Sequence, residues 1–420
     1  MKKICLVYPE CYEVERFGNK RKELPPFGVM YLASALEKEN YDVKIVPTSN
    51  DNNSFDFKDF DMVGFSISSS LAYPLIKKTR ENSIFKANSL IIAGGIHASL
   101  YPREVIGELD CDIVSIGEGE ITIVEIAKAS SLDDFEKIKG IYYKKDNNIY
   151  ITDKRENIDD LDTIDFPARH LLPKEDIVMK RLADTSLPIA HVLFSRGCPY
   201  HCNFCANQNH NIRYRSKENI KEELELLIKD YGIKGFCVFD DNFLVNKEKA
   251  MEIIREIGKL NLKWSTLARV DNVDLELLKE LKNTGCVEIK YGVETGSQKM
   301  LDLMNKKITV SEIKKAFNLT KDVGINAKAL IMHGFPKEDI NTTKETIALL
   351  EELKMCISRI GLTYFTYLPG SPIYPSEHIT CNTSVYCEDQ VPWGSDKEKE
   401  EVLESRKLLV KYIKNNFPNK

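Results

Sequence analysis

The stretch that decides how this chain folds reads Ser195-Arg196-Gly197-Cys198-Pro199-Tyr200-His201-Cys202-Asn203-Phe204-Cys205. It spaces three cysteines as C-x3-C-x2-C, directly after the apolar run Ile189–Phe194. Three thiolates can hold three irons of a cubane [4Fe–4S] cluster. The fourth iron then keeps an open position that can bind and reduce a substrate, which a cluster held by four cysteines cannot do. The spacing therefore predicts a reactive cluster in a loop that follows a strand.

A zinc site is the alternative interpretation of the same thiols. Thiolates suit zinc as well as iron–sulfur clusters. His201 and His210 lie close enough in the sequence to complete a set of three cysteines and one histidine. Structural zinc sites, however, take four ligands in paired knuckles. For that reason the cluster is the prediction, and zinc remains the alternative.

Length and composition narrow the class of protein. The chain has 420 residues, which favours two or three domains, and its 43% hydrophobic and 29% charged residues are typical of soluble globular proteins. The formal net charge of −5 provides no electrostatic basis for a nucleic-acid partner. The basic runs Lys20-Arg21-Lys22 and Lys306-Lys307 are interpreted as solvated surface.

The cellular compartment is predicted from the apolar segments, the first residues and the cysteines of the sequence. No apolar run approaches the length needed to cross a bilayer, and the first eight residues turn polar too quickly for a signal peptide. Eleven cysteines without a secretion signal predict a reducing, cytoplasmic location. Four cysteines in apolar segments are predicted to be packed thiols, and two near the C-terminus are interpreted as structural or at most partial ligands: Cys5, Cys237, Cys286 and Cys356, then Cys381 and Cys387.

Residues 1–150 alternate apolar strands with amphipathic helices and end in a β-hairpin over 137–151, which predicts an α/β domain with a doubly wound parallel sheet. Ligands of such sheets bind beyond the carboxyl ends of the strands. The loops expected there are rich in glycine and serine, which permit close approach and supply hydroxyls. No G-x-G-x-x-G follows the first strand, which disfavours a nicotinamide cofactor. The predicted strands are Ile4–Tyr8, Val43–Val46, Met62–Ser66, Leu90–Ala93 and Ile113–Ile116, and the predicted helices are Gly28–Glu39, Leu71–Thr79, Pro102–Leu109 and Glu120–Lys128.

Residues 188–375 carry a second alternating pattern, after a proline-containing linker over 151–187. Six strand–helix units predict a partial (β/α)6 TIM-type barrel, with its chemistry at the carboxyl ends of the strands. Residues 376–420 are predicted to be a short tail that ends in an amphipathic helix rich in Lys and Glu. The predicted strands are Ile189–Phe194, Gly235–Phe239, Lys263–Ala268, Val287–Gly292, Ala327–Met332 and Gly361–Thr366, and the predicted helices are Ile220–Asp230, Lys247–Lys259, Leu275–Asn283, Gln298–Met304, Val310–Val323 and Asn341–Leu353.

On these residues the barrel resembles the radical S-adenosylmethionine (SAM) superfamily. The likeness rests on Cys198, Cys202 and Cys205, with Phe204 in the familiar aromatic position. It continues at later strand ends, in Phe239-Asp240-Asp241-Asn242-Phe243, Ala268-Arg269-Val270-Asp271, Gly292-Val293-Glu294-Thr295-Gly296-Ser297, Gly334-Phe335-Pro336 and Leu368-Pro369-Gly370-Ser371-Pro372-Ile373-Tyr374.

The N-terminal half resembles the cobalamin-binding domain found ahead of the barrel in one large branch of that superfamily. The matching loops are Pro25-Pro26-Phe27-Gly28, leading into Tyr31-Leu32-Ala33, then Gly94-Gly95-Ile96-His97 and Gly117-Glu118-Gly119-Glu120. Together the two resemblances cover residues 1 to about 375. They imply three cofactors: a [4Fe–4S] cluster, SAM and cobalamin.

The resemblance implies roles for four strand-end residues in binding SAM. Carboxylates suit the amine and the ribose diol of SAM, and Asp240, Asp241 and Glu294 stand at suitable positions. Arg269 could meet the SAM carboxylate with two hydrogen bonds. The alternative for each is a strand-end charge that caps a helix or pairs locally.

Seven residues of the N-terminal loops are candidates for cobalamin contacts. The chain lacks the D-x-H-x-x-G motif that supplies a histidine to cobalt, which implies that the corrin binds without such a ligand. His97 is therefore given a loop role near the corrin, and a hydrogen-bonded histidine without cofactor contact is the alternative. The candidates are Ser66, Ser68, Gly94, Gly95, His97, Gly117 and Glu118.

Aromatic and histidine side chains at the mouth of the barrel complete the candidates, and no catalytic side chain is assigned. Tyr200 and His201 could touch SAM or the corrin edge, or only shape the cysteine loop. Three residues at the last two strand ends could line a substrate pocket or simply pack: His333, Tyr364 and Tyr367.

The resemblance implies a cobalamin-dependent radical SAM methyltransferase that methylates an unactivated carbon of a small or medium substrate. A 5′-deoxyadenosyl radical would remove hydrogen, and methylcobalamin would supply the methyl group. One alternative keeps the cofactors but performs ring contraction, cyclisation or rearrangement. Another is a non-catalytic cobalamin or redox sensor. An electron donor such as flavodoxin or ferredoxin is the expected partner, without nucleic acid or membrane.

Overall fold

The fold is described from a computed structural model that covers residues 2–10, 12–13, 21–22, 25–179, 182–183, 185–207, 209–375 and 391–417. The chain forms two compact units, Met1–Ile177 and Val178–Lys420, and the division falls inside the segment predicted as a linker. Cys381, Cys387 and Lys20 lie outside the described residues, as do the side chains of Arg21 and Lys22.

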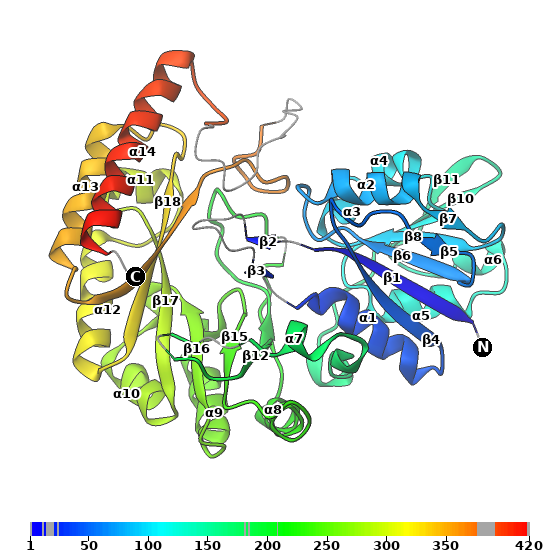
Figure 1. Cartoon of the computed structure of the whole chain (residues 1–420), viewed down its shortest axis with the longest axis horizontal. Coiled ribbons are helices and arrows are strands. Elements are labelled where there is room, and N and C mark those ends of the chain that lie inside the picture. The colour runs from blue at the N-terminus through cyan, green and yellow to red at the C-terminus, as the bar shows by residue number, and fades with distance from the viewer. Residues whose placement is uncertain are drawn as a thin grey trace. The chain divides into compact units, whose positions relative to one another are not determined.

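The first unit is built around one mostly parallel sheet (Figure 1). Among the described residues its strands run in the order β11-β10-β9-β8-β6-β1-β4. The five parallel strands thus have the 2-1-3-4-5 order of doubly wound folds, whose ligands bind beyond the carboxyl strand ends. The strands are β1 (Lys3–Pro9), β4 (Asp42–Thr48), β6 (Met62–Ser66), β8 (Leu90–Gly94) and β9 (Ile113–Ser115), with the predicted hairpin β10 (Ile141–Lys145) and β11 (Asn148–Ile151) paired antiparallel at the edge.

Helices cover both faces of this sheet, with α1 and α5 on one side and α2 and α4 on the other (Figure 1). The core strands are near-continuous apolar runs, as expected when both faces are buried. One helix was not predicted: α3 begins at Ile96, so His97 lies in a helix and not in a loop. The helices are α1 (Phe27–Lys38), α2 (Tyr73–Asn82), α3 (Ile96–Leu100), α4 (Pro102–Glu108), α5 (Glu120–Lys128), α6 (Leu132–Phe135) and α7 (Lys174–Ile177), and the short pairs are β2 (Tyr12–Glu13) with β3 (Arg21–Lys22) and β5 (Asp56–Phe57) with β7 (Ile84–Phe85).

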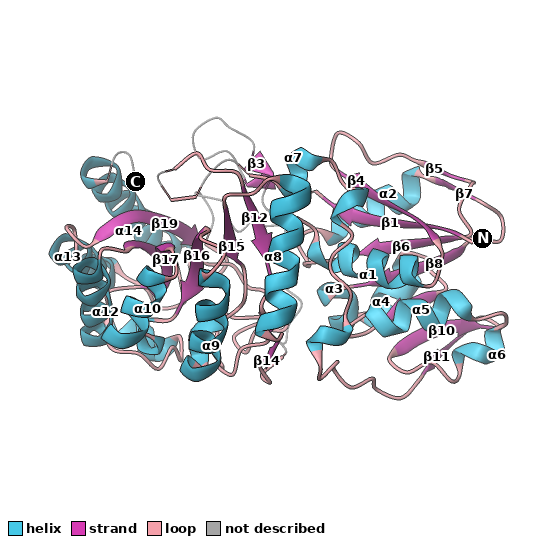
Figure 2. Ribbon diagram, turned by 90° about the horizontal axis from the view of Figure 1, so that it is seen from below, coloured by secondary structure: helices cyan, strands magenta, loops and turns pink. Residues whose placement is uncertain are grey.

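The second unit contains the predicted partial barrel. Six parallel strands follow chain order in the part that the structure describes, and the helices lie on the outer face of the curved sheet (Figure 2). The strands are β12 (Ile189–Val192), β15 (Gly235–Val238), β16 (Lys263–Ala268), β17 (Cys286–Glu294), β18 (Asn326–His333) and β19 (Ile357–Tyr364), and a small pair, β13 (Ser195–Arg196) and β14 (Arg213–Tyr214), brackets the cysteine loop.

Local sequence explains where the barrel helices begin and end. Ser216 and Thr309 accept backbone N–H groups at the starts of α8 and α12, and Gly232 and Gly324 end these helices in the left-handed conformation. The helices are α8 (Lys217–Tyr231), α9 (Lys247–Gly258), α10 (Leu275–Asn283), α11 (Gln298–Leu303), α12 (Val310–Val323) and α13 (Ile340–Glu352). The strand predicted over 361–366 is displaced, because β19 begins four residues earlier, at Ile357.

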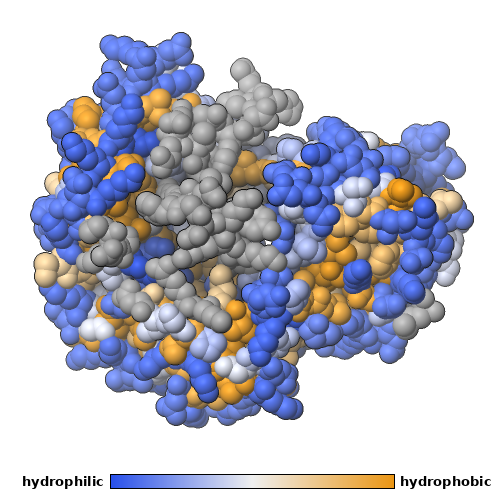
Figure 3. All heavy atoms as spheres, viewed as in Figure 1, coloured by the Kyte–Doolittle hydropathy of each residue, from blue (hydrophilic) through white to orange (hydrophobic). Residues whose placement is uncertain are grey.

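The C-terminal helix α14 (Asp396–Asn416) confirms the amphipathic helix predicted in the tail. It packs against α13, and hydrophilic side chains dominate its outer surface (Figure 3). In the described ranges, we find no helix whose length and apolar character would let it span a membrane.

Candidate functional site

The three cysteines lie on one loop between β13 and β14, beyond the carboxyl end of β12. Gly197 starts the loop with a φ of +99°, and a side chain there would collide with the Asn211 carbonyl oxygen. The Cys198 N–H donates to the carbonyl of Asn209 over 2.9 Å, and the Cys205 N–H donates to that of Cys202 over 3.1 Å. The loop thus holds its three thiols in a defined backbone conformation.

The turn after α11 anchors this loop from the opposite part of the sheet. The Asn203 N–H donates to the Met304 carbonyl over 2.9 Å, and Asn305 Nδ2 donates to the His201 carbonyl over 2.6 Å. The Ile373 N–H donates to the Asn203 carbonyl over 3.1 Å. Segments far apart in the sequence therefore fix the position of the thiols.

The donor set fits an iron–sulfur cluster, because three soft thiols share one loop. Cys202 is buried, Cys198 is half-buried and Cys205 is exposed. The histidines of the zinc alternative, His201 and His210, stack on each other with ring centroids 3.9 Å apart. Within the described part of the chain, no three His, Cys, Asp or Glu side chains gather closely enough to ligate a single metal ion.

Asp240 holds the end of β12 in place. Its carboxylate is buried and accepts the Phe194 N–H over 2.8 Å and the Ser195 hydroxyl over 2.5 Å. Burial raises the pKa of this carboxyl to about 7. These contacts match the local-pairing alternative for Asp240 and couple β15 to the start of the cysteine loop.

Asp241 stands next to Asp240, and its side chain is exposed. Burial raises the pKa of the Cys198 thiol, and the negative charge of Asp241 adds to that effect. The same carboxylate also acts on Cys205. Asp241 is therefore close enough to the cysteine loop for its charge to act on two of the thiols.

Arg269 does not reach into open space but joins four groups around the cysteine loop. Its Nε and Nη2 donate to the two carboxylate oxygens of Asp271, each over 2.9 Å, and Nη2 also donates to the Lys306 carbonyl over 2.7 Å. Its Nη1 lies 3.8 Å from Cys202 Sγ, and the guanidinium stacks 3.6 Å above the Tyr200 ring. Tyr200 is thereby part of the loop's support.

Glu294 occupies a strained position at the end of β17. Its φ is +64°, and the register with β18 shifts between Gly292 and Glu294. Such outliers persist where surrounding contacts hold them, often at functional sites. Its carboxylate pairs with Lys306 over 2.6 Å, directly above Gly292, where a β-carbon would meet both groups within 3 Å.

The interpretation of Lys306 as solvated surface is wrong. Lys306 is 5% exposed, pairs with Glu294 and lies 5.6 Å from the Phe204 ring of the cysteine loop, while Lys307 is exposed as predicted. The two lysines separate because the turn after α11 directs one inward, and composition alone carries no signal for that turn.

The buried polar atoms without a hydrogen-bond partner in the described structure include two in the strand-end motifs: Asn242 Oδ1 after β15 and Ser297 Oγ after β17. Both residues are 1% exposed or less. Buried polar atoms are normally satisfied, so an unpartnered pair marks where a bound ligand can complete the contacts. The sequence signal for both was their place in the strand-end motifs.

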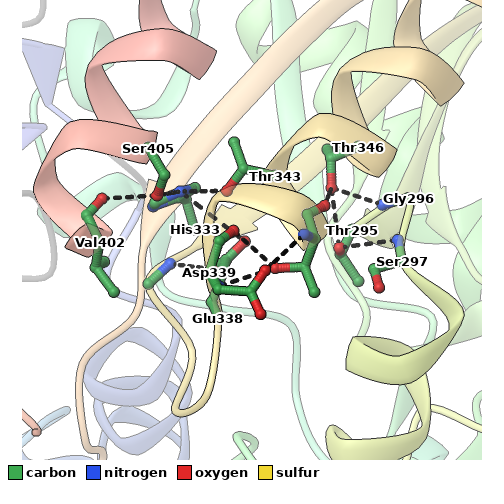
Figure 4. A network of polar contacts seen from close by, with 12 residues as sticks. Thr295, Gly296, Ser297, His333, Glu338, Asp339, Thr343, Thr346, Val402 and Ser405 are labelled. Atoms are coloured by element: carbon green, nitrogen blue, oxygen red, sulfur yellow. Dashed lines mark hydrogen bonds and ion pairs between the residues drawn. The ribbon is translucent and has the colours of Figure 1, made fainter. Parts of the chain in front are cut away.

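His333 does not line a pocket. It is fully buried, and its Nε2 contacts Thr343 Oγ1 of α13 and Ser405 Oγ of α14, each at 3.2 Å (Figure 4). Glu338 lies 3.9 Å away, and burial raises its pKa to about 7. The residue therefore docks the C-terminal helix onto the end of β18.

The tyrosine that ends β19 and the one three residues beyond it also pack. Tyr364 lies under the Arg406 guanidinium at 4.2 Å, and Tyr367 meets the Phe365 ring at 5.1 Å. Both are buried. The packing alternative given for these residues is the one that their contacts match.

In the first unit, the candidate cobalamin loops meet at the carboxyl ends of β6, β8 and β9. Gly95 has a φ of +101°, and a β-carbon there would lie 2.7 Å from the Ile67 carbonyl oxygen. His97 is 8% exposed, its Nδ1 lies 2.8 Å from Ser70 Oγ, and its ring contacts the rings of Tyr73 and Tyr101. Burial lowers the pKa of His97 to about 4.

The remaining loop candidates differ in their exposure and in whether other residues of the protein already contact them. Glu118 accepts the Ile158 N–H over 2.7 Å, while Gly117 has open space where a side chain would be. Ser66 is half-buried and Ser68 is exposed. The Ser115 hydroxyl, buried at the end of β9 beside Gly94, has no partner among the described residues. Open glycine faces and an unsatisfied hydroxyl fit a large ligand such as a corrin.

Comparisons with known proteins agree with both halves. Residues 192–350 match the family model of the radical SAM superfamily, and residues 18–127 match that of the B12 binding domain. An uncharacterized methyltransferase of Pyrococcus horikoshii, PH0819, is 31% identical over 83% of this chain and 78% of its own length.

Two further proteins extend the comparison. The anaerobic magnesium-protoporphyrin IX monomethyl ester cyclase of Cereibacter sphaeroides is 28% identical over 83% of this chain, which spans 60% of the cyclase. The solved structure of the radical SAM methyltransferase TsrM from Kitasatospora setae, with cobalamin and a [4Fe–4S] cluster bound, superposes with a TM-score of 0.67 at 16% identity over 89% of this chain and 74% of TsrM. That likeness is one of fold.

Proposed function

The chain belongs to the radical SAM superfamily and carries a B12-binding domain ahead of its radical SAM domain, and on that premise we propose that it methylates an unactivated carbon. It is a radical SAM enzyme that uses a [4Fe–4S] cluster, SAM and cobalamin. The observation that carries the methyl transfer is the similarity, over most of both chains, to a relative described as a methyltransferase.

The cofactors supply the chemistry when bound: the cluster delivers the electron that cleaves SAM, and cobalamin carries the methyl group. The residues of the chain bind and orient them. Cys198, Cys202 and Cys205 hold the cluster. Asp241 and Glu294, at the ends of β15 and β17, are suited to the SAM amine and ribose, with the unsatisfied Asn242 and Ser297 beside them in the sequence motifs.

In the first unit we assign the corrin to the serine and glycine loops at the carboxyl ends of β6, β8 and β9. The open face at Gly117 and the buried Ser115 hydroxyl support this assignment. We place His97 beside that site and not as a cobalt ligand, since the chain lacks the D-x-H-x-x-G motif and the imidazole already contacts Ser70, Tyr73 and Tyr101.

The substrate is a small molecule, and a low-potential electron donor such as flavodoxin or ferredoxin reduces the cluster. The decisive experiment incubates the reconstituted protein, cobalamin and a reductant with SAM carrying a deuterated methyl group and a metabolite extract. A product that retains an intact CD3 group, formed with both S-adenosylhomocysteine and 5′-deoxyadenosine, is the expected result. Formation of 5′-deoxyadenosine with an unlabelled product would refute methyl transfer.

Cyclisation without methyl transfer is the second candidate, favoured by the similarity to the magnesium-protoporphyrin ester cyclase. The same labelling experiment separates the two, because cyclisation changes the product without adding deuterium.

A further inference from the structure

Arg269 has a contact that the binding of SAM does not explain. Its Nη1 points at Cys202 Sγ from 3.8 Å, inside a site where Arg269 is 7% exposed and Cys202 is 9% exposed. A cysteine that ligates a cluster carries negative charge on its sulfur. Hydrogen bonds to such sulfurs are one of the terms that set the reduction potential of a cluster.

The surroundings determine the direction of this guanidinium. Two parallel hydrogen bonds to Asp271 hold Nε and Nη2, and the Lys306 carbonyl accepts a second bond from Nη2. The Tyr200 ring covers one face of the plane at 3.6 Å. A planar group fixed at one edge and one face leaves its remaining nitrogen, Nη1, directed at the thiol.

We propose that Arg269 is a positioning residue for the cluster, which orients Cys202 and raises the reduction potential by donating an N–H to its sulfur. This inference rests on the proposed function, since it needs the cluster. A donor that stabilises the added negative charge of the reduced cluster lets a single electron from a low-potential donor enter more readily. The same guanidinium ties the cysteine loop to the Lys306 turn, because its Nη2 donates to the Lys306 carbonyl.

The test measures the midpoint potential of the reconstituted full-length protein without SAM, by titration followed with the electron paramagnetic resonance signal of the reduced cluster. Arg269→Gln should lower the ratio of reduced to oxidised cluster at least tenfold at a fixed potential, which corresponds to about 59 mV for one electron. Asp271→Asn, which leaves Arg269 intact but loosens its orientation, should shift the potential in the same direction by less.

Arg359→Lys is the matched control, because Arg359 forms its own buried ion pair with Glu288, two residues from the starts of β17 and β19. It should leave the potential unchanged. If Arg269→Gln folds but binds much less iron, the Asp271→Asn shift decides the proposal. If both variants have full iron content and the wild-type reduction potential, the proposed role of Arg269 is overturned, while the proposed function still stands. Wild-type protein without a cluster would instead overturn the proposed function.

Discussion

Replacing Lys306 with methionine should destabilise the barrel unit by at least about 3 kcal/mol, because it leaves the Glu294 carboxylate buried and unpaired. The side chains of Lys306 and Glu294 are 7% and 13% exposed, and their charged atoms lie 2.6 Å apart. Water therefore cannot replace the lost partner fully. Methionine matches the length of the lysine stem, so the change removes the charge with little loss of packing.

Urea unfolding followed by tryptophan fluorescence measures this loss. Both tryptophans of the chain, Trp264 and Trp393, belong to the second unit, so the signal reports on the barrel. With a slope of about 3 kcal/mol per molar urea, the midpoint should fall by about 1 M. Lys307→Met is the control, because that neighbour is exposed and its loss should change stability by less than about 0.5 kcal/mol.

A second variant separates the ion pair from general damage. Replacing Lys306 and Glu294 together with methionine removes both charges, and an apolar pair of similar volume is often neutral relative to a buried ion pair. The double variant should therefore recover most of the lost stability. The reasoning fails if Lys306→Met shifts the midpoint no more than Lys307→Met, or if the double variant is no more stable than the single one.

Three further predictions address the cofactors and the pH dependence. Anaerobically reconstituted protein should carry about four irons per chain, and Cys202→Ala should lose them while Cys356→Ala, outside the loop, keeps them; zinc in place of iron would restore the zinc alternative. Cobalamin bound as Co(II) should show no nitrogen splitting from a protein histidine in electron paramagnetic resonance, because the chain lacks the D-x-H-x-x-G motif; a splitting that is lost in His97→Ala would contradict this placement. Burial raises the Glu338 pKa from 4.5 to about 7. The contribution of Glu338 to stability is therefore full below pH 4.5 and is lost as the pH rises to about 7. Glu338→Gln should remove that loss from urea midpoints measured across this pH range, and a pH profile equal to that of the wild type would contradict this prediction.

Much of the fold could be predicted because hydrophobic periodicity and the residues that end helices and strands are local properties of the sequence. The strand over 263–268 and the helices over 275–283 and 310–323 have the predicted bounds, since apolar spacing, capping residues and glycines act within a few residues. The helix carrying His97 was missed because only five residues form it and glycines precede it. The start of β19 was misplaced because its early residues, Ser358 and Arg359, are polar and find their partners on the nearby strands β18 and β17, which are distant in the sequence.

For the site, the sequence by itself determined the cysteine loop, the strand ends that surround it and the family to which they belong. Thiol spacing and strand-end motifs are chemical patterns that can be recognised without knowing their neighbours. Only the tertiary structure decided that Lys306 is buried while Lys307 is exposed, that Arg269 faces Cys202, and that His333 docks a helix. Each of these depends on a contact between residues at least 12 positions apart, up to 72, and burial and pairing across such distances are set by packing and not by the residue or its neighbours in the chain.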